Sequence, residues 1–217
     1  ESCSDILFIK TCPFCNSKLA RPNGEVNYYC LNHDFCFPQK ISRIEHFISR
    51  DAMNIHTLGV KTIHLLVKEN IIENIGDLYE LDVADLQPLR GFGLESNSIK
   101  KAENIIQSIQ LSKQVPFEKV LYGLGVRYVG KIASKKIAKY SGSIFNLMNF
   151  SRDDLLNIDE VGDKIADSIL LYFNSVRNKN LICRLIDHGL NFKTDKADNE
   201  SNKLLDLVFV ISGTFTE

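Results

Sequence analysis

A short turn that ends in glycine, followed by an amphipathic helix, recurs four times along this chain of 217 residues, and it restricts the possible folds more than any other feature. Each turn follows the pattern hydrophobic, any residue, then Gly, Thr or Glu, hydrophobic, Gly, and the next residues place apolar or small side chains on one helical face. The copies lie at 55–59, 89–93, 123–125 and 158–162. The repeat predicts a mainly α fold built from packed helix pairs.

The four copies form two pairs that look duplicated. Gly59 and Gly125 are 66 residues apart, and Gly93 and Gly162 are 69 residues apart. The segments between them also match, because 76–81 (Gly-Asp-Leu-Tyr-Glu-Leu) resembles 142–147 (Gly-Ser-Ile-Phe-Asn-Leu). Repetition at a fixed period indicates one structural unit used twice.

A glycine turn in front of a helix can bind an anion. The first N–H groups of a helix have no partner within it and lie at the positive end of the helix dipole, and phosphate is a common ligand there. The third copy is the strongest candidate, because Lys131 and Lys135 follow it and no acidic residue lies between Lys119 and Ser141. We predict phosphate contact at this copy, through Gly123, Gly125, Arg127, Lys131 and Lys135.

The first and fourth copies depart from the pattern. They carry Thr57 and Glu160 where the others have the first glycine, and the Glu160 carboxylate would repel a nearby phosphate. The sequence therefore leaves open whether these two copies bind phosphate.

Four of the six cysteines lie close together and predict a metal site. Cys12, Cys15, Cys30 and Cys36 have the spacing C-x2-C-x14-C-x5-C, which allows four thiolates to surround Zn²⁺ as a tetrahedron. Strand-like residues 26–29 and a turn at 21–24 between the cysteine pairs predict a small β-hairpin. His33 is an alternative ligand, although four thiolates are the simpler set and His33 is expected to face solvent. A closed site of this kind is structural.

The composition excludes several protein classes. The net charge is −1, so nucleic-acid binding must depend on local basic patches. A hydrophobic content of 44% is typical of a folded protein, and no apolar run is long enough to span a membrane. Clustered cysteines favour a metal site in a reducing compartment over disulfides, which predicts a cytoplasmic protein.

Further elements are expected around the repeats. A short helix is predicted at 41–47 and another at 180–190, with Gly189 as its C-cap and Cys183 in the core. Asp77 and Ser143 are the expected N-caps of the helices that follow them.

The two ends of the sequence indicate neighbouring domains. The chain does not begin with Met, and residues 1–11 are interpreted as the tail of a domain that lies upstream. Residues 12–40 form the cysteine segment, 41–192 the repeat domain, and the polar stretch 193–203 a linker. Strand-like residues from 204 onward predict the start of a truncated domain.

This order of parts resembles the C-terminal half of bacterial NAD-dependent DNA ligase. The resemblance rests on the four-cysteine zinc finger, on the repeats read as four helix-hairpin-helix motifs, and on Val208-Phe-Val-Ile-Ser-Gly-Thr-Phe215, which is similar to the start of a BRCT domain. It covers nearly the whole chain. The resemblance also identifies 1–11 as the tail of an OB-like domain.

The resemblance implies a parent enzyme that seals nicks in duplex DNA during replication and repair. Such enzymes use NAD⁺ and Mg²⁺ and proceed through an enzyme–AMP intermediate formed in an adenylation domain. The Lys-x-Asp-Gly nucleophile of that domain is absent from this sequence. The resemblance therefore implies no catalytic residue here, an inactive fragment, and partners that comprise nicked DNA and the N-terminal adenylation and OB domains. A monomer associated with the nucleoid is expected.

Carried over to this sequence, the zinc role falls on the four clustered cysteines, and the DNA contacts fall on the glycine turns and on nearby basic residues. The DNA-binding set is Gly59, Lys61, Arg90, Gly91, Gly93, Gly123, Gly125, Arg127, Lys131, Lys135, Gly162 and Lys164. Because amides and lysines contact phosphates, binding is expected to be independent of base sequence.

Two other functions are compatible with the repeats. The first is the helix-hairpin-helix region of a repair nuclease or branch-processing subunit, which the order of finger and repeats argues against. The second is a protein-interaction scaffold whose helices do not contact DNA. Charge reversal at Lys131 and Lys135 would separate the scaffold from the DNA-binding alternatives.

Overall fold

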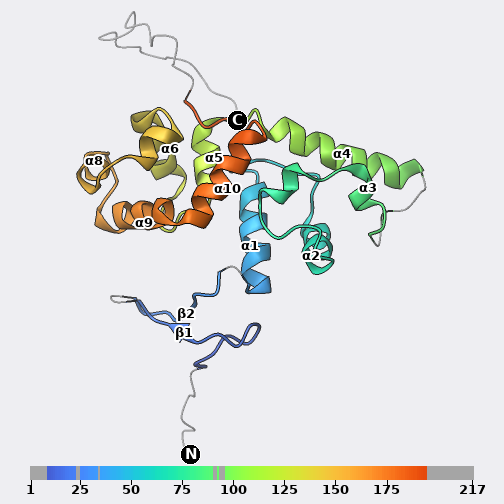
Figure 1. Ribbon diagram of the computed structural model, residues 1–217, viewed down its shortest axis with the longest axis horizontal. Coiled ribbons are helices and arrows are strands. Elements are labelled where there is room, and N and C mark those ends of the chain that lie inside the picture. The colour runs from blue at the N-terminus through green and yellow to red at the C-terminus, as the bar shows by residue number, and fades with distance from the viewer. Residues whose placement is uncertain (1–8, 23–24, 34, 90–91, 93–95, 195–217) are drawn as a thin grey trace, which may run out of the picture.

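The computed structural model describes residues 9–22, 25–33, 35–89, 92 and 96–194 (Figure 1). The predicted upstream tail is therefore described only at 9–11, and the BRCT-like start, Arg90, Gly91 and Gly93 lie outside the described residues. The elements, in chain order, are β1 (Leu19–Ala20), β2 (Tyr29–Cys30), α1 (Phe37–Ile48), α2 (Val60–Lys68), the 3-10 helix η1 (Asp77–Tyr79), α3 (Val83–Leu86), α4 (Ser96–Ser112), α5 (Phe117–Gly123), α6 (Lys131–Ser141), α7 (Ile144–Met148), α8 (Arg152–Leu156), α9 (Asp163–Asn174) and α10 (Val176–Asp187). The described chain is mainly helical, as predicted, and none of its helices is long and apolar enough to cross a bilayer.

The predicted β-hairpin is present in the cysteine segment. β1 and β2 are antiparallel, with Leu19 opposite Cys30 and Ala20 opposite Tyr29. The second strand is shorter than the predicted 26–29, since Val26 lies before it and is 86% exposed. The hairpin thus carries Cys30 toward the first pair of cysteines.

Four helix pairs share one hydrophobic core. α1 packs on α2, α3 on α4, α5 on α6 and α8 on α9. The first, second and fourth copies of the repeat lie between the two helices of a pair. The core extends without a break from Ile41 in α1 to Phe192 after α10. A single pair would leave its apolar face exposed, so the pairs are stable only when they pack together.

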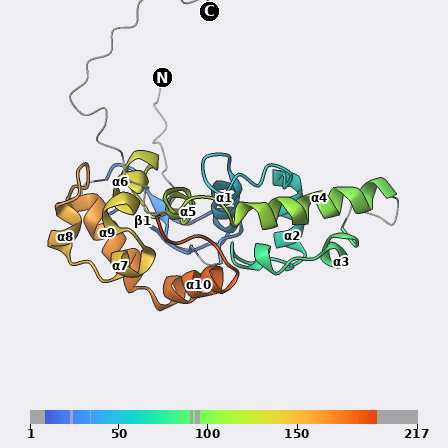
Figure 2. The same ribbon diagram turned by 90° about the horizontal axis from the view of Figure 1, so that it is seen from above.

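The two halves of the duplication lie at opposite ends of the helical domain. Figures 1 and 2 both show α2, α3 and α4 at one end and α6, α8 and α9 at the other, with α1 and α5 between them. α1 and α5 pack directly against each other. The Nε2 of His46 on α1 lies 2.8 Å from the carbonyl oxygen of Tyr122 on α5.

One of the two predicted N-caps is confirmed. The Ser143 side chain accepts a hydrogen bond from Asn146 N at the start of α7. Asp77 does not cap η1, so that prediction is wrong. Its carboxylate accepts from the backbone N–H groups of Glu73 (2.7 Å) and Asn74 (2.9 Å), which precede it.

α10 confirms the predicted last helix and its C-cap glycine, but the prediction for Cys183 is wrong. Gly189 has φ +86°, and Leu190 N donates to Leu185 O, so the carbonyls at the end of α10 are satisfied. Cys183 is exposed, because the buried stripe of α10 runs through Ile182 and Leu185.

Candidate metal and nucleic-acid sites

The four predicted zinc ligands lie together. The sulfur atoms of Cys12, Cys15, Cys30 and Cys36 all lie within 4.8 Å of one another. Cys12 and Cys36 are 3.9 Å apart, and Cys15 and Cys30 are 3.5 Å apart. A tetrahedral zinc site with bonds of 2.3 Å has sulfur–sulfur edges of about 3.8 Å, and the Cys12–Cys36 and Cys15–Cys30 separations lie close to this value, so the four thiols suit zinc.

The surroundings of the thiols differ. Hydrogen bonds from the hydroxyl and the backbone of Ser17 lower the pKa of Cys15 to about 6, whereas loss of hydration raises the pKa of Cys30 to about 12. The ligands must bind as thiolates, so metal binding would release protons and depend on pH. No position is left for a substrate, and the site is structural.

His33 is not part of the cluster. Its ring is exposed, and Nδ1 lies 2.6 Å from Oε1 of Gln39 in α1. The expectation that His33 faces solvent is confirmed, and the four thiols form the candidate ligand set.

The predicted third turn lies in the wrong place. Gly123 is the last residue of α5 rather than part of the turn before α6. Gly125 follows the C-cap of α5, has φ +68°, and donates its N–H to Tyr122 O at 3.1 Å. α6 begins only after Gly130. The turn that precedes it is therefore Val126-Arg-Tyr-Val-Gly130, which follows the same pattern with tyrosine in place of the first glycine.

Gly123 has a packing role instead of a phosphate role. It is buried between α5 and α1, where an added Cβ would lie 3.2 Å from Cδ2 of Phe47 and 3.3 Å from Cβ of Ala52. Its N–H is inside the helix and is not open to a ligand. The sequence favours Gly123-Leu-Gly125 over Tyr128-Val-Gly130 because only the former has both glycines of the motif.

Three glycines occupy one equivalent place, immediately before a helix. Gly59, Gly130 and Gly162 are the N-caps of α2, α6 and α9, and all three are exposed. Each has extended backbone with φ between −82° and −91°, which any residue can adopt, and a Cβ there would meet nothing within 4 Å. The fold itself therefore does not require glycine at these positions.

The third residue of two of these turns is left-handed. Tyr128 has φ +66° and Glu160 has φ +64°, at the position that Gly91 holds in the second copy. Left-handed backbone is uncommon for residues other than glycine. The third and fourth turns nevertheless adopt it, with tyrosine and glutamate at the position where the motif has glycine.

Acidic residues from other segments pair with the lysines of α6. Lys131 pairs with Asp51, and Lys136 pairs with Asp159 and, at 2.9 Å, with Glu160. The sequence around α6 contains no acidic residue, but the fold brings acidic side chains from other segments next to its lysines. Lys136 also compensates the Glu160 charge, which was expected to repel phosphate.

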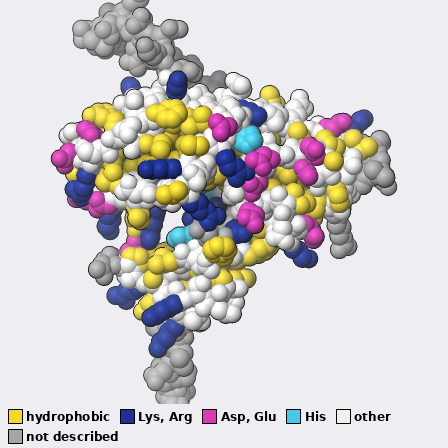
Figure 3. All heavy atoms as spheres, viewed as in Figure 1, with side chains coloured by type: hydrophobic (Ala, Val, Ile, Leu, Met, Phe, Trp, Pro, Cys, Tyr) yellow, Lys and Arg dark blue, Asp and Glu magenta, His cyan; other side chains and the backbone are white. Residues whose placement is uncertain are grey.

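Other predicted basic contacts differ in their surroundings. Lys61 and Lys164 are exposed at the second residue of α2 and α9, and Lys135 is exposed on α6. Arg127 pairs with Glu25 of the zinc finger. Figure 3 shows Lys and Arg side chains at the hollow between the finger and the helical domain.

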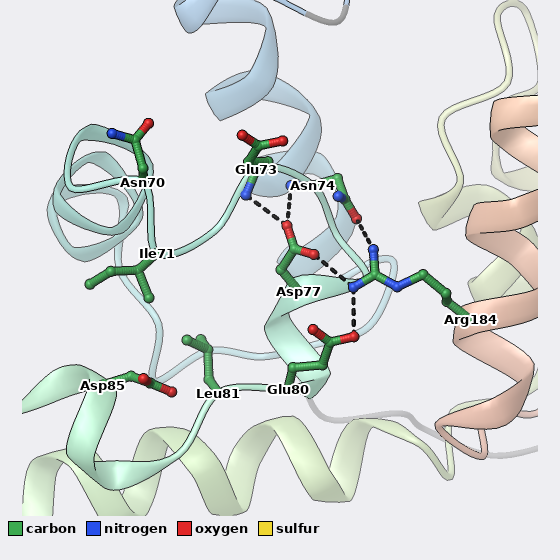
Figure 4. A pocket seen from close by; sticks show the side chains of 9 residues that line it. All are labelled: Asn70, Ile71, Glu73, Asn74, Asp77, Glu80, Leu81, Asp85 and Arg184. Carbon is green, nitrogen blue, oxygen red and sulfur yellow. Dashed lines mark hydrogen bonds and ion pairs between the residues drawn. The ribbon is translucent and has the colours of Figure 1, made fainter.

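A second hollow of about 500 Å³ has the opposite charge. Figure 4 shows the carboxylates of Asp77 and Glu80 directed at the Arg184 guanidinium, with nitrogen–oxygen distances of 2.7 and 2.6 Å. Glu73 and Asp85 add further negative charge. This pocket is unsuited to phosphate and lies where α10 meets η1.

Comparison with known proteins agrees with the site geometry. A family model described as NAD-dependent DNA ligase C4 zinc finger domain matches residues 11–36, and one described as helix-hairpin-helix motif matches 119–182. Curated proteins named DNA ligase are similar over almost the whole chain. They include those of Phocaeicola vulgatus (45% identical over 212 residues), Flavobacterium psychrophilum (43% over 210) and Hydrogenobaculum (42% over 211).

These alignments cover 97%, 96% and 97% of this chain but only 31%, 31% and 29% of the respective relatives. The chain thus spans about a third of the length of the curated relatives it matches. The repair-nuclease alternative is not favoured by these matches.

Proposed function

Since this chain is the zinc-finger and helix-hairpin-helix part of an NAD-dependent DNA ligase, we propose that it holds nicked duplex DNA through the phosphate backbone. The helix pairs present the contacts, and the zinc finger is a structural unit attached to the start of α1. Chemistry at the nick belongs to the remainder of the polypeptide.

The observation that supports this proposal is the open glycine before α2, α6 and α9. Neither the backbone conformation nor the internal packing requires glycine at positions 59, 130 and 162, because φ is negative and an added Cβ would meet no atom within 4 Å. The close approach of another molecule explains why glycine stands at these N-caps, because a side chain there would cover the first N–H groups of the helix. A phosphate oxygen accepts hydrogen bonds from such groups and is favoured by the helix dipole.

The candidate phosphate contacts are distributed over the helical domain. The three open helix starts come from both halves of the duplication, which lie at opposite ends of the domain (Figure 2). Contacts from several helix starts to backbone phosphates hold a duplex without reading its bases. Lys61, Lys135 and Lys164 add positive charge near these starts.

For the parent enzyme we infer NAD⁺-dependent sealing of nicks through AMP intermediates, with NAD⁺ and Mg²⁺ bound outside this chain. The adenylation and OB domains of the same polypeptide are the expected partners, and this fragment alone should not ligate. We further infer a cytoplasmic, monomeric protein.

The test is binding of a labelled nicked duplex, measured by fluorescence anisotropy over a series of salt concentrations. The logarithm of the association constant should fall by about 0.9 per contacted phosphate for each tenfold increase in salt. Gly130→Ser should weaken binding about tenfold or more, because its side chain occupies the phosphate position. Folding should be unchanged or improved, since serine is a good N-cap.

Ser175→Ala is the matched control, because Ser175 caps α10, a helix start outside the repeat. It should lower stability slightly and leave DNA affinity unchanged. Wild-type affinity in Gly130→Ser, or a salt slope near zero, would overturn the proposed function.

A further inference from the structure

The zinc finger contacts the third turn through one carboxylate. Nη2 of Arg127 lies 2.8 Å from Oε1 of Glu25, and the Tyr128 hydroxyl donates a hydrogen bond to the same oxygen. Glu25 belongs to the finger hairpin, whereas Arg127 and Tyr128 lie in the turn before α6. Two neighbouring residues of one turn therefore hold a single anionic group.

Aromatic rings fix the arginine in this position. The guanidinium carbon of Arg127 lies 4.6 Å from the ring centroid of Tyr29 and 4.9 Å from that of Tyr128. A cation over an aromatic face is attracted to it, and stacking restricts the planar guanidinium. The positive charge is thus directed at one place instead of moving freely in solvent.

The backbone of Tyr128 supports the same arrangement. Its φ of +66° is unusual for an aromatic residue, and from this backbone its hydroxyl reaches the same Glu25 oxygen as the Arg127 guanidinium does. Thr57, the equivalent residue of the first turn, has no such conformation and no such acidic partner among the described contacts. Of these two turns, the third alone makes the carboxylate contact among the described residues.

The surroundings favour a negative charge. Hydrogen bonds from Tyr128 and Tyr29 lower the pKa of the Glu25 carboxyl, and the charges of Arg127 and Lys164 lower it further. Lys164 is the second residue of α9 and so belongs to the fourth turn. Positive charge from two turns thus acts on the position that the carboxylate occupies.

We propose that Arg127 and Tyr128 form an anion site, that Glu25 of the zinc finger occupies it in the free chain, and that a phosphate of the DNA backbone replaces Glu25 on binding. This inference rests on the proposed function. A phosphodiester has the same single negative charge as the carboxylate and accepts hydrogen bonds from guanidinium and hydroxyl groups in the same way. The exchange therefore leaves the net charge of the site unchanged.

The contact is weak enough to exchange. The Arg127 side chain is 42% exposed, so water screens its end of the pair, whereas the Glu25 side chain is 16% exposed. A group that must leave before a ligand binds lowers the apparent affinity for that ligand. Glu25 therefore acts as an internal competitor of DNA, and DNA binding releases the finger hairpin from the third turn.

The test compares nicked-duplex affinity in wild type, Glu25→Gln and the control Glu69→Gln. The control makes the same charge change at the exposed end of α2, away from its N-terminal turn. Glu25→Gln should bind about two- to fivefold more tightly than the control, the range expected for loss of a partly exposed ion pair. In an Arg127→Gln background, Glu25→Gln should have no effect. Zinc content should be equal in all variants.

Hydrogen exchange of residues 25–33 provides a second measurement. DNA should accelerate exchange there in wild type, whereas Glu25→Gln should exchange fast with and without DNA. Equal affinities of Glu25→Gln and Glu69→Gln, or exchange that DNA leaves unchanged or slows, would overturn this inference while leaving the proposed function intact. A wild-type chain that does not bind the duplex would overturn both.

Discussion

The zinc finger and the helical domain are stabilised in different ways. In the finger, large apolar side chains remain in solvent, with Val26 86%, Phe35 79% and Phe14 72% exposed. In the helical domain, Phe47 and Phe117 are at most 1% exposed within a shared core. The finger is too small to bury an apolar core, so four thiols around a metal replace it.

This difference is sharpest where the two regions meet. Cys36 is both a predicted zinc ligand and the N-cap of α1, with Gln39 N and Lys40 N donating to its carbonyl oxygen at 3.0 Å. The metal site thus fixes the first turn of a helix whose remaining turns are held by the core. The stability of the two regions should therefore be separable everywhere except at the start of α1.

The largest effect is expected from loss of the metal. Cys36→Ser, or treatment with a chelator, should unfold residues 11–36 and the first turn of α1, because zinc binding contributes about 10–16 kcal/mol to such sites. The other helices should persist, since their core contains no metal ligand. Zinc content and hydrogen exchange along the chain would measure both effects.

Cys183→Ser is the control for this prediction, because Cys183 is an exposed thiol on α10. It should retain zinc and all of its structure. Melting of the helical domain on metal removal would show that the two regions fold as one unit, contrary to the comparison.

A smaller effect is expected from the core. Phe47 is completely buried and packs edge-to-face on Tyr79, with ring centroids 6.2 Å apart. Phe47→Ala should lower the free energy of unfolding of the helical domain by about 3–5 kcal/mol, through lost burial and the cavity left behind. Urea unfolding followed by circular dichroism would measure it, with Phe47→Leu as a milder control. If Phe47→Ala also lowered the urea concentration at which zinc is released, to the midpoint for unfolding of the helical domain, the zinc finger and the helical domain would not be stabilised independently.

Much of this organisation could be predicted from the sequence. The cysteine spacing identified all four clustered thiols, and the helical periodicity identified the paired helices and the final helix. Local patterns succeed here because the ligand spacing and the apolar stripe are both properties of short segments.

The errors involve contacts between distant segments. Whether Gly123 or Gly130 precedes α6 depends on where α5 ends, and α5 continues because Gly123 allows it to approach Phe47 and Ala52. The acidic partners of Lys131 and Arg127 come from Asp51 and Glu25, which are far away in the sequence. Neither the helix boundary nor these pairs could be predicted from the residues around them.

The smallest effect is expected from the ion pairs that join α10 to η1. Hydrogen bonds from Arg184 and His188 lower the pKa of Glu80, so this group stabilises the fold above its unfolded pKa of about 4.3, and the contribution is lost as the pH falls through the lowered value. Arg184→Gln should cost about 0.5–1 kcal/mol near neutral pH, because the Arg184 and Glu80 side chains are 37% and 52% exposed. Urea unfolding of the helical domain at neutral and falling pH would measure it, with Lys179→Gln as the control on the exposed face of α10. A cost that persists unchanged in acid would show that Arg184 stabilises this joint by packing rather than by charge.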